Sequence, residues 1–417
     1  MKHTFYQTNR KNYLAEVNSN SITVLFSGSV FQQSADNYFP FAVNKNFYYL
    51  TGINQANVTL ILVKGENYTD ELLFIERNDE LMAKWVGRKL TIEEVKATSG
   101  VDKVYYLEDF DKVLHNLLNP HRRSTLMTNT VYLDLERRQD LDYHHKGLRF
   151  GQQLRHDYPE LDIKNAYHLI VSLRMIKTPE EVELIKASID TTKHALEAVM
   201  KNIKPDLYEY QIESYFNQYI KFNGNKDIAF ETICAAGKNA TILHYVDNNT
   251  IAKADDLILF DLGCQTEFYI SDISRTYPVS GKFSPRQAEV YQTVLEVNKK
   301  CIEFVKPGIT WVEFNNYANS LLVEGLKKLG KIKEDKELVN YYWHSIGHSI
   351  GLDTHDPVIA TMPLKENMVV TIEPGLYLED EGIGIRIEDN VLLTKDKAIN
   401  LSKDLIKEIK DIEAFMK

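Results

Sequence analysis

Short apolar runs alternate with amphipathic segments along residues 1–170. The runs have the length and the β-branched or aromatic content of strands, and the segments between them space their apolar residues as helices do. The predicted strands are Ser21–Phe26, Ala56–Val63, Glu71–Ile75 and Val131–Leu135, and the predicted helices include Thr91–Thr98 and Leu107–Leu118. This alternation predicts an N-terminal α/β domain over residues 1–170.

A second domain is predicted over residues 171–417. It follows a linker of mixed character, Tyr167–Lys177, and begins where Thr178 can act as a helix N-cap, with Pro179 and Glu181 behind it. A Thr cap with Glu three residues later pairs two free backbone N–H groups, and proline suits the first helical position. We therefore expect a long amphipathic helix to open this domain.

The second domain carries a weak internal repeat. A Lys-Pro turn after a long helical pattern occurs at Lys204-Pro205 and again at Lys306-Pro307, 102 positions later (306 − 204). Ser284-Pro285-Arg286-Gln287 also starts the second helix with the capping chemistry of the first. Such turns are common, so chance is the alternative. The repeat predicts a pseudo-two-fold α+β domain, with a site where two half-sheets meet.

Composition narrows the class of protein. The chain has 417 residues, 44% of them hydrophobic, and no apolar run approaches the length of a membrane span. The first residues lack the apolar segment of a signal peptide, and three cysteines form a sparse set without metal-type spacing. The formal net charge is −10. We therefore expect a cytoplasmic protein with reduced thiols, no membrane association and no nucleic-acid partner.

Four carboxylates stand at the ends of apolar runs, where an isolated charge is costly. Leu257–Phe260 leads into Asp261, Phe268–Ile270 into Ser271 and Asp272, Met368–Ile372 into Glu373, and Ile383–Ile387 into Glu388. Carboxylates directed toward a core repel one another unless a cation gathers them. With His348 they form a hard, oxygen-rich ligand set. This set suits a pair of divalent ions such as Mn²⁺, Co²⁺ or Zn²⁺ better than a structural zinc.

The spacing of these residues supports a site, although each pair has a simpler interpretation. Asp261 and Asp272 are 11 positions apart (272 − 261), a spacing that suits two strands of a hairpin. Taken alone, the pair would be interpreted as one aspartate in a turn and one at a strand edge. Arg386 and Glu388 share a strand face, either as a plain ion pair or with Arg386 steadying carboxylates and developing negative charge.

Three histidines lie within twelve positions: His344, His348 and His355, beside Gly347 and Gly351. A lone histidine is more often a core residue. Glycines let the backbone approach closely, so a cluster of this kind favours a site over packing.

The four carboxylates and His348, in their order along the chain, resemble the ligand set of the pita-bread metallopeptidase family, which includes methionine aminopeptidase, aminopeptidase P and prolidase. The resemblance covers Met175–Lys417 and rests on the segments Asp261–Cys264, Asp272–Thr276, His344–Asp356, Thr371–Tyr377 and Ile385–Asp389. It implies that Asp261, Asp272, His348, Glu373 and Glu388 are all metal ligands. The family's substrate-contacting histidines correspond to His244 and His355. Phe268, Ser271 and Ser274 depart from the family pattern, which leaves the loop shape open.

The N-terminal region looks like the opening domain of aminopeptidase P at Ala35–Phe41, Asn44–Gly52 and Lys84–Leu90. The resemblance implies a homo-oligomer, a dimer or tetramer, in which Trp85 reaches a neighbour's active site from a surface loop. The alternative for Trp85 is an ordinary packed aromatic. Methionine aminopeptidases generally lack this domain, whereas prolidases have a related one.

The resemblance implies a dinuclear metal-dependent Xaa-Pro aminopeptidase, which removes the first residue from peptides with proline second. Mn²⁺ is the expected metal, with Co²⁺ or Zn²⁺ as alternatives. Glu373 would bind metal and transfer the proton, and Arg386 would orient carboxylates. The predicted substrate contacts are His244, His344, His355, Tyr377 and Trp85. Two alternatives remain: a prolidase, which cleaves only dipeptides, and a metal-free peptide-binding protein of the same fold.

Overall fold

The computed structural model describes residues 1–119, 126–137, 146–225 and 228–417, which form two compact units, Met1–Arg174 and Met175–Lys417. Among these residues, no helix combines the length and the apolar composition needed to cross a membrane.

Unit 1 is built on a mixed six-stranded sheet with the order β6-β5-β4-β1-β7-β8. Its central strands are almost wholly buried, which explains their continuous apolar runs. The strands are β1 (Ser21–Phe26), β4 (Thr59–Lys64), β5 (Thr69–Ile75), β6 (Lys103–Tyr106), β7 (Thr130–Leu133) and β8 (Asp162–Asn165), and a separate hairpin contains β2 (Gln32–Ser34) and β3 (Asn37–Tyr38). All four predicted strands are therefore present, with ends that shift by a few residues.

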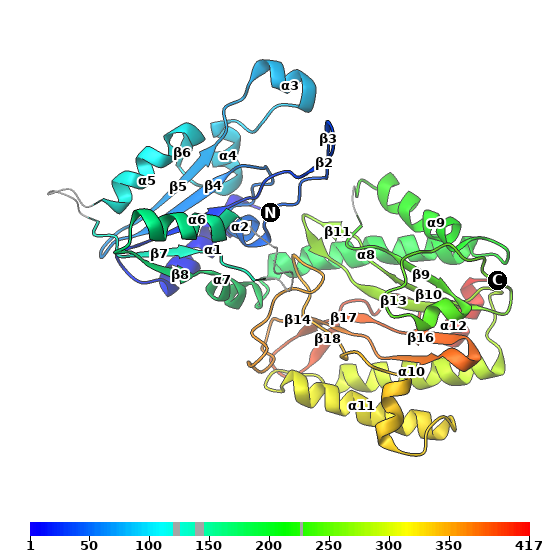
Figure 1. The fold of residues 1–417 in the computed structure, drawn as a ribbon. Coiled ribbons are helices and arrows are strands. Elements are labelled where there is room, and N and C mark those ends of the chain that lie inside the picture. The colour runs from blue at the N-terminus through cyan, green and yellow to red at the C-terminus, as the bar shows by residue number, and fades with distance from the viewer. Residues whose placement is uncertain (120–125, 138–145, 226–227) are drawn as a thin grey trace. The chain divides into compact units, whose positions relative to one another are not determined.

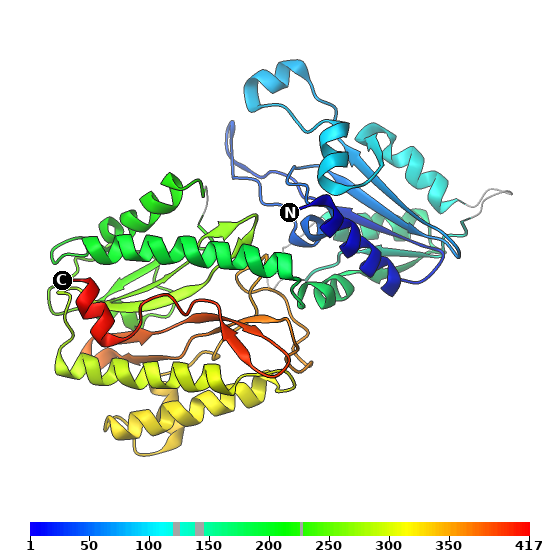
Figure 2. The same cartoon turned by 180° about the vertical axis from the view of Figure 1, so that it is seen from behind.

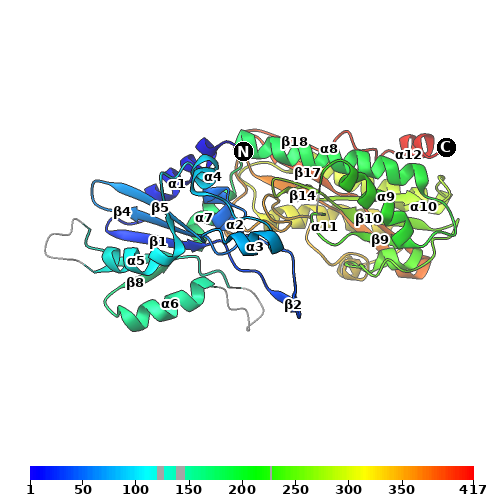
Figure 3. The same ribbon diagram turned by 90° about the horizontal axis from the view of Figure 1, so that it is seen from above.

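Helices cover both faces of this sheet (Figure 3). On one face, α5 (Phe110–Leu118) and α6 (Lys146–Asp157) bury Leu114, Leu118 and Leu154 against strand residues such as Val24 and Phe74. The helices on the other side are α1 (His3–Glu16), α2 (Lys45–Thr51), α4 (Ile92–Ser99) and α7 (Tyr167–Arg174). A full capping box at Thr91 explains where α4 begins.

Two local predictions in unit 1 were wrong. Most of the expected linker, Tyr167–Lys177, is helix α7, because Ile170 and Val171 are buried on its inner face. Trp85 lies in a short helix, α3 (Glu80–Val86), and not in a loop. Asp79 caps this helix by accepting from two backbone N–H groups. The expected exposure of Trp85 is correct, since 79% of its surface is accessible.

Unit 2 has two helix pairs on opposite sides of its strands (Figures 1 and 2). The first pair is α8 (Pro179–Asn202) and α9 (Glu209–Phe222), and the second is α10 (Pro285–Phe304) and α11 (Trp311–Lys328). The capping boxes at Thr178 and Ser284 are both formed. The repeated capping sequences therefore mark equivalent helices, and the pseudo-two-fold prediction is confirmed.

The strands of unit 2 form two main groups. The first has the order β13-β10-β9, and in the second β14 pairs with β17 and β15 with β16. The bounds are β9 (Ile233–Ala236), β10 (Leu257–Leu262), β11 (Gln265–Thr266), β12 (Tyr269–Ile270), β13 (Ile273–Pro278), β14 (Val369–Ile372), β15 (Gly375–Leu378), β16 (Ile383–Arg386), β17 (Asp389–Leu393) and β18 (Ala398–Asn400), with a last helix, α12 (Ile409–Phe415).

The second group is one antiparallel ladder with a short interruption. Ile372 lies opposite Asp389 at one side of it, and Gly375 lies opposite Arg386 at the other. The register is the same on both sides. Two residues of each strand therefore face each other without regular pairing, and the candidate site begins there.

Candidate metal centre

The first group of strands supplies the two aspartates. Asp261 belongs to β10 and lies opposite Ser274 of β13, while Asp272 directly precedes β13. Residues two apart on a strand share a face, so Asp272 and Ser274 project to the same side as Asp261. Close packing holds this arrangement: a Cβ on Gly263 would lie 1.8 Å from the Ser271 carbonyl oxygen.

The second group supplies the two glutamates. Continuing the register through the interruption sets Glu373 opposite Glu388 and Pro374 opposite Ile387. In this pairing the Ile387 N–H donates to the Pro374 carbonyl over 3.2 Å. Side chains directly opposite on antiparallel strands lie close together. The two carboxylates therefore meet at a point that neighbouring β-pairs hold on both sides.

His348 reaches the carboxylates from a separate segment. Its backbone N–H donates to Thr371 Oγ1 over 2.9 Å, and its carbonyl accepts from the Thr371 N–H. A Cβ on Gly347 would lie 2.1 Å from the Thr371 carbonyl oxygen, so only glycine allows this approach. His348 Nε2 is 3.4 Å from Asp272 Oδ2 and 3.5 Å from Glu373 Oε1.

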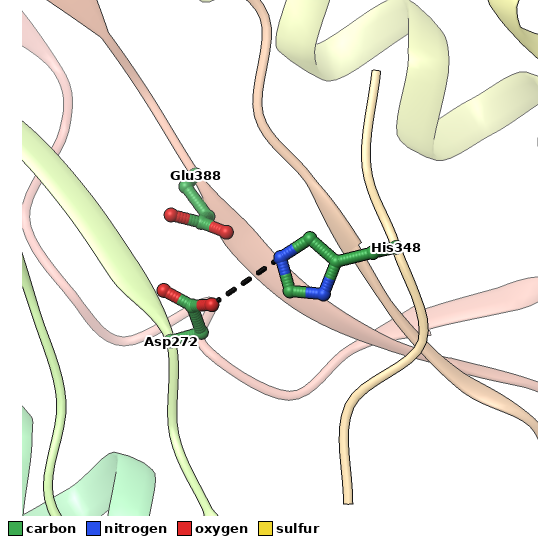
Figure 4. A group of neighbouring side chains, drawn as sticks. All are labelled: Asp272, His348 and Glu388. Carbon is green, nitrogen blue, oxygen red and sulfur yellow. Dashed lines mark ion pairs between the residues drawn. The ribbon is translucent and has the colours of Figure 1, made fainter. Parts of the chain in front are cut away.

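Three of these side chains already have the geometry of a cation site. Ligand atoms of Asp272, His348 and Glu388 lie within 4.8 Å of one another, and Figure 4 shows the three groups converging from different elements. Hydrogen bonding leaves two carboxylate oxygens unused: Asp261 Oδ1 and Glu388 Oε1 are buried and have no partner among the described residues. A buried carboxylate oxygen without a donor is costly, and a bound cation would remove that cost.

The electrostatics of the carboxylates agree with a cation site. Burial raises the pKa of Asp272, and the charges of Asp261 and Glu373 raise it further. Burial likewise raises the pKa of Glu388, with Asp272 as the next cause. Burial raises the pKa of Glu373 against the opposing charges of His348 and Arg386. The negative charge of the cluster is thus poorly compensated by the protein alone, and its oxygen-rich composition fits divalent metal ions.

Histidines aside, Arg386 is the only cationic residue in the described part of the chain that forms an ion pair with one of these carboxylates. Its Nη2 donates to Asp261 Oδ2 over 2.7 Å, and its Nε donates to Ser274 Oγ over 2.8 Å. The Ser274 hydroxyl in turn donates to Glu388 Oε2 over 2.8 Å. Ser274, a departure from the family pattern, therefore connects Arg386 to a second carboxylate.

Both ring nitrogens of His344 have hydrogen-bond partners within the protein. Arg386 Nη1 donates to the Tyr377 hydroxyl, which lies 2.8 Å from His344 Nε2, and His344 Nδ1 lies 2.9 Å from the Ser345 carbonyl. Burial and the charge of Arg386 lower the pKa of His344 to about 3, so the ring is neutral. It then donates from Nδ1 and accepts at Nε2. Both ring nitrogens therefore have partners within the protein, and a contact of His344 with substrate stays a prediction.

His355 and His244 are exposed side chains near the cluster. The His355 ring lies edge-on to His348, with centroids 4.3 Å apart. Partial burial lowers the pKa of His355, with His348 and His244 as the next causes. His355 therefore keeps a neutral ring that can donate to a ligand beside the carboxylates.

The comparisons with known proteins agree with this geometry. Residues 183–395 match the model for metallopeptidase family M24, and residues 6–127 match the aminopeptidase P N-terminal domain. An Xaa-Pro aminopeptidase of Escherichia coli is 30% identical over 99% of this chain and 97% of its own length. The chain belongs to metallopeptidase family M24.

Solved M24 structures share the whole architecture. A Bacillus anthracis protein, provisionally described as an aminopeptidase P, matches with a TM-score of 0.96 and 45% identity over 100% of this chain and 98% of its own. Aminopeptidase P from E. coli, solved with the inhibitor Pro-Leu, matches with a TM-score of 0.89 and 28% identity over 100% and 98%. The resemblance to the aminopeptidase P family is confirmed, and the protein is a metallo-aminopeptidase.

Two supports of this M24 site were missed from the sequence. Buried Glu209 accepts from the N–H groups of Ala236 and Thr250 and from the Tyr245 hydroxyl, and so anchors the segment that carries His244. Lys177 and Asp356 form an ion pair of 2.9 Å, with each side chain 1% exposed, next to His355. These contacts join residues far apart in sequence, so no local pattern reveals them.

Proposed function

We propose that this M24 protein is a dinuclear metal-dependent Xaa-Pro aminopeptidase. The observation that carries the proposal is the convergence of Asp261, Asp272, His348, Glu373 and Glu388 from two strand groups, with two buried carboxylate oxygens unpaired. Xaa-Pro as the substrate class is supported by the name of the E. coli relative and by the Pro-Leu inhibitor of the E. coli structure.

The five residues would hold two divalent ions, for which we propose Mn²⁺. When bound, the ions would lower the pKa of a water molecule and polarise the scissile carbonyl. The carboxylates suit hard cations, and a single imidazole leaves room for Co²⁺ or Zn²⁺ as substitutes in vitro. Arg386 would keep Asp261 in place by its bond of 2.7 Å and steady the cluster before metal arrives.

Glu373 is our candidate for proton transfer. Its pKa is raised by burial, and its carboxylate lies 3.5 Å from His348 and 3.8 Å from His344. A carboxylate with a raised pKa can accept a proton from water and return it to the leaving nitrogen of proline. His355 and His244 would donate hydrogen bonds to the substrate carbonyl as its oxygen gains negative charge.

Aromatic side chains offer an apolar surface beside the site. Trp343 is 46% exposed, and its ring lies 5.0 Å from that of Tyr377. An exposed indole next to buried polar groups is suited to contact an apolar ring such as proline. We propose that proline is recognised by shape, since its imide nitrogen in the peptide has no hydrogen to donate.

A peptide panel tests the proposed activity. Full-length protein is stripped of metal, reloaded with Mn²⁺, and assayed on Ala-Pro, on a longer Xaa-Pro peptide, and on the same peptide with alanine second. We expect release of the first residue from the longer Xaa-Pro peptide and little turnover of the alanine peptide. Cleavage of Ala-Pro alone would instead identify a prolidase. No cleavage with any of Mn²⁺, Co²⁺ and Zn²⁺ would contradict the proposal.

We also propose that the protein is a homo-oligomer, a dimer or tetramer, in which Trp85 contributes to a neighbour's substrate site. Helix α3 supports this, because none of its residues is buried and Leu81, Met82, Trp85 and Val86 are all at least 50% exposed. Exposed apolar surface on this scale is typical of an interface, and tryptophan is a common anchor.

Mixing two impaired variants tests this role. Trp85→Ala should keep its metal content and lose more activity on long peptides than on Ala-Pro. Mixed with Glu373→Gln, it should recover part of the lost activity, because each variant supplies what the other lacks. A monomer by light scattering, or mixtures with no recovery, would contradict the proposal.

A further inference from the structure

The interruption that holds Glu373 and Glu388 leaves a backbone acceptor without its strand partner. In the continued register Pro374 lies opposite Ile387, and a regular ladder would have each of the two donate to the other. The Ile387 N–H does donate to the Pro374 carbonyl. Proline has no N–H to return, so the Ile387 carbonyl needs another donor.

Asn298 of helix α10 provides that donor. Its side chain is fully buried, and its Nδ2 donates to the Ile387 carbonyl over 3.1 Å. The same Nδ2 also donates to the Ile372 carbonyl over 3.2 Å. These two carbonyls belong to the residues directly before Glu388 and Glu373. One amide group therefore ties together the backbones from which the two glutamates project.

Lys407 sets the direction of this amide. Its Nζ donates to Asn298 Oδ1 over 2.8 Å and to Asp389 Oδ2 over 2.6 Å. Because an ammonium group can only donate, it selects the carbonyl end of the amide and leaves Nδ2 facing the strands. Asp389 is held on its other oxygen by Arg275, and neither side chain of that ion pair is exposed. The orientation of Asn298 thus rests on a buried charged network.

The other half of unit 2 has a corresponding contact. Thr192 of α8 and Asn298 of α10 each lie fourteen residues beyond the N-cap of their helix (192 − 178 and 298 − 284). Thr192 Oγ1 accepts from the Cys264 N–H and is 2.8 Å from the hydroxyl of Ser271, which precedes Asp272. Each long helix therefore places a buried polar side chain against a residue that directly precedes an acidic residue of the site.

We propose that Asn298, oriented by Lys407, is a positioning residue that sets the separation of Glu373 and Glu388 and thereby the spacing of the two metal ions. The inference rests on the proposed two-ion site, but it concerns residues outside the ligand set. It predicts that a change at Asn298 alters metal binding even though all five ligands remain.

The decisive variant is Asn298→Asp, which keeps the shape and a partner for Lys407 but cannot donate to the two carbonyls. Full-length metal-free protein is titrated with Mn²⁺ by calorimetry. We expect the affinity to fall about 10- to 100-fold, the usual effect of removing a group that orients a metal ligand. In the two-Mn²⁺ protein, the magnetic coupling measured by electron paramagnetic resonance should also change, because it depends on the separation of the ions.

A matched control separates positioning from general loss of packing. Cys301→Ala removes a buried side chain one turn further along α10, and its Sγ has no hydrogen bond to the ligand-bearing strands in the described part of the chain. It should leave both the affinity and the coupling near wild type. If Asn298→Asp does not fold, Lys407→Met keeps the amide and frees its rotation, and it should lower the affinity in the same direction.

The outcomes distinguish this inference from the proposed function. Wild-type protein that binds fewer than two Mn²⁺ would overturn the two-ion site and the inference with it. Wild-type protein that binds two, together with Asn298→Asp or Lys407→Met that bind two with unchanged affinity and coupling, would overturn the inference alone. Equal losses of Mn²⁺ affinity in Asn298→Asp and Cys301→Ala would also overturn the inference, because Asn298 would then contribute only to packing.

Discussion

The two halves of the catalytic unit hold their acidic residues by different means. In the first half, Asp261 lies within the β10–β13 ladder, whereas Asp272 lies in a break between that ladder and the β11–β12 pair. The neutral hydroxyls of Thr192 and Ser271 support the backbone of this break by accepting from the Cys264 N–H. In the second half, both glutamates lie in a break of the ladder, and a buried network that includes Asn298 and Lys407 supports them.

This difference shows how a repeated helix–strand frame can be adapted to one shared site. In the break of the first half no proline intervenes, and the Ser271 N–H still donates to the Cys264 carbonyl over 3.1 Å. Where Pro374 removes a donor, the longer glutamates gain a place to meet, but an amide and buried charges must replace the missing pairing. The second half is therefore the half in which supporting residues matter more.

The largest expected effect is that of Glu373→Gln in the second half. Glutamine keeps the shape but cannot carry a proton between water and the leaving nitrogen. We expect kcat on an Xaa-Pro peptide to fall by about 10²–10⁴-fold at saturating Mn²⁺, the range of a general acid–base group. Retention of most activity would show that the proton is transferred elsewhere.

His355→Ala should have a smaller effect on activity and none on metal. We propose His355 as a substrate contact, and its exposure lets water replace part of the lost hydrogen bond. We expect kcat/KM to fall by about 2 kcal/mol, roughly 30-fold, with the metal content unchanged. Loss of metal in proportion to activity would make His355 a ligand instead.

Glu388→Gln should raise or lower the melting temperature, depending on whether metal is bound and on the pH. The pKa of Glu388 is raised in the folded protein by burial and by Asp272, so its ionised form is disfavoured there. Its contribution to stability is full at pH values below its unfolded pKa and is lost as pH rises toward the folded pKa. Metal-free Glu388→Gln should therefore melt above the metal-free wild type at pH 7.5.

Two further conditions test that sign. The difference in melting temperature should shrink as pH falls toward the ordinary carboxyl range, where both proteins are neutral at this position. With Mn²⁺ in excess the order should reverse, because only the wild type gains binding energy. A metal-free variant that melts below the wild type at neutral pH would contradict the claim that burial and neighbouring carboxylates destabilise the ionised form of Glu388.

The smallest expected effect is that of Thr192→Val in the first half. The change replaces a buried hydroxyl by a methyl group beside the break that contains Asp272, at a cost of about 1–2 kcal/mol of folding free energy. We expect the Mn²⁺ affinity to stay within about threefold of wild type, well below the change at Asn298. Similar losses at Thr192 and Asn298 would remove the contrast between the halves.

The sequence predicted most of what local chemistry determines. The capping residues Thr178 and Ser284 marked the long helices. Charged residues at the ends of apolar runs marked the four candidate carboxylate ligands, and the cluster of three histidines marked His348. Short amphipathic elements were less clear. Helix α7 was predicted as a linker, since its eight residues show little beyond mixed polarity.

The supporting residues could not be predicted, because their roles depend on partners distant in sequence. Asn298 contacts the carbonyls of Ile372 and Ile387, and Lys177 pairs with Asp356. Nothing near Asn298 in the chain separates it from any other asparagine in a helix. Its role follows from the register of two strands and from a proline in one of them, which only the folded structure brings together.

The most direct test of a two-ion site shared between the halves is anomalous diffraction from crystals loaded with Mn²⁺. We expect two manganese peaks about 3.5–4 Å apart, as in other two-metal hydrolases. Both should be bound by residues of the first and second halves together: Asp261, Asp272, His348, Glu373 and Glu388. A single fully occupied peak in active protein, or two peaks bound by other residues, would contradict it.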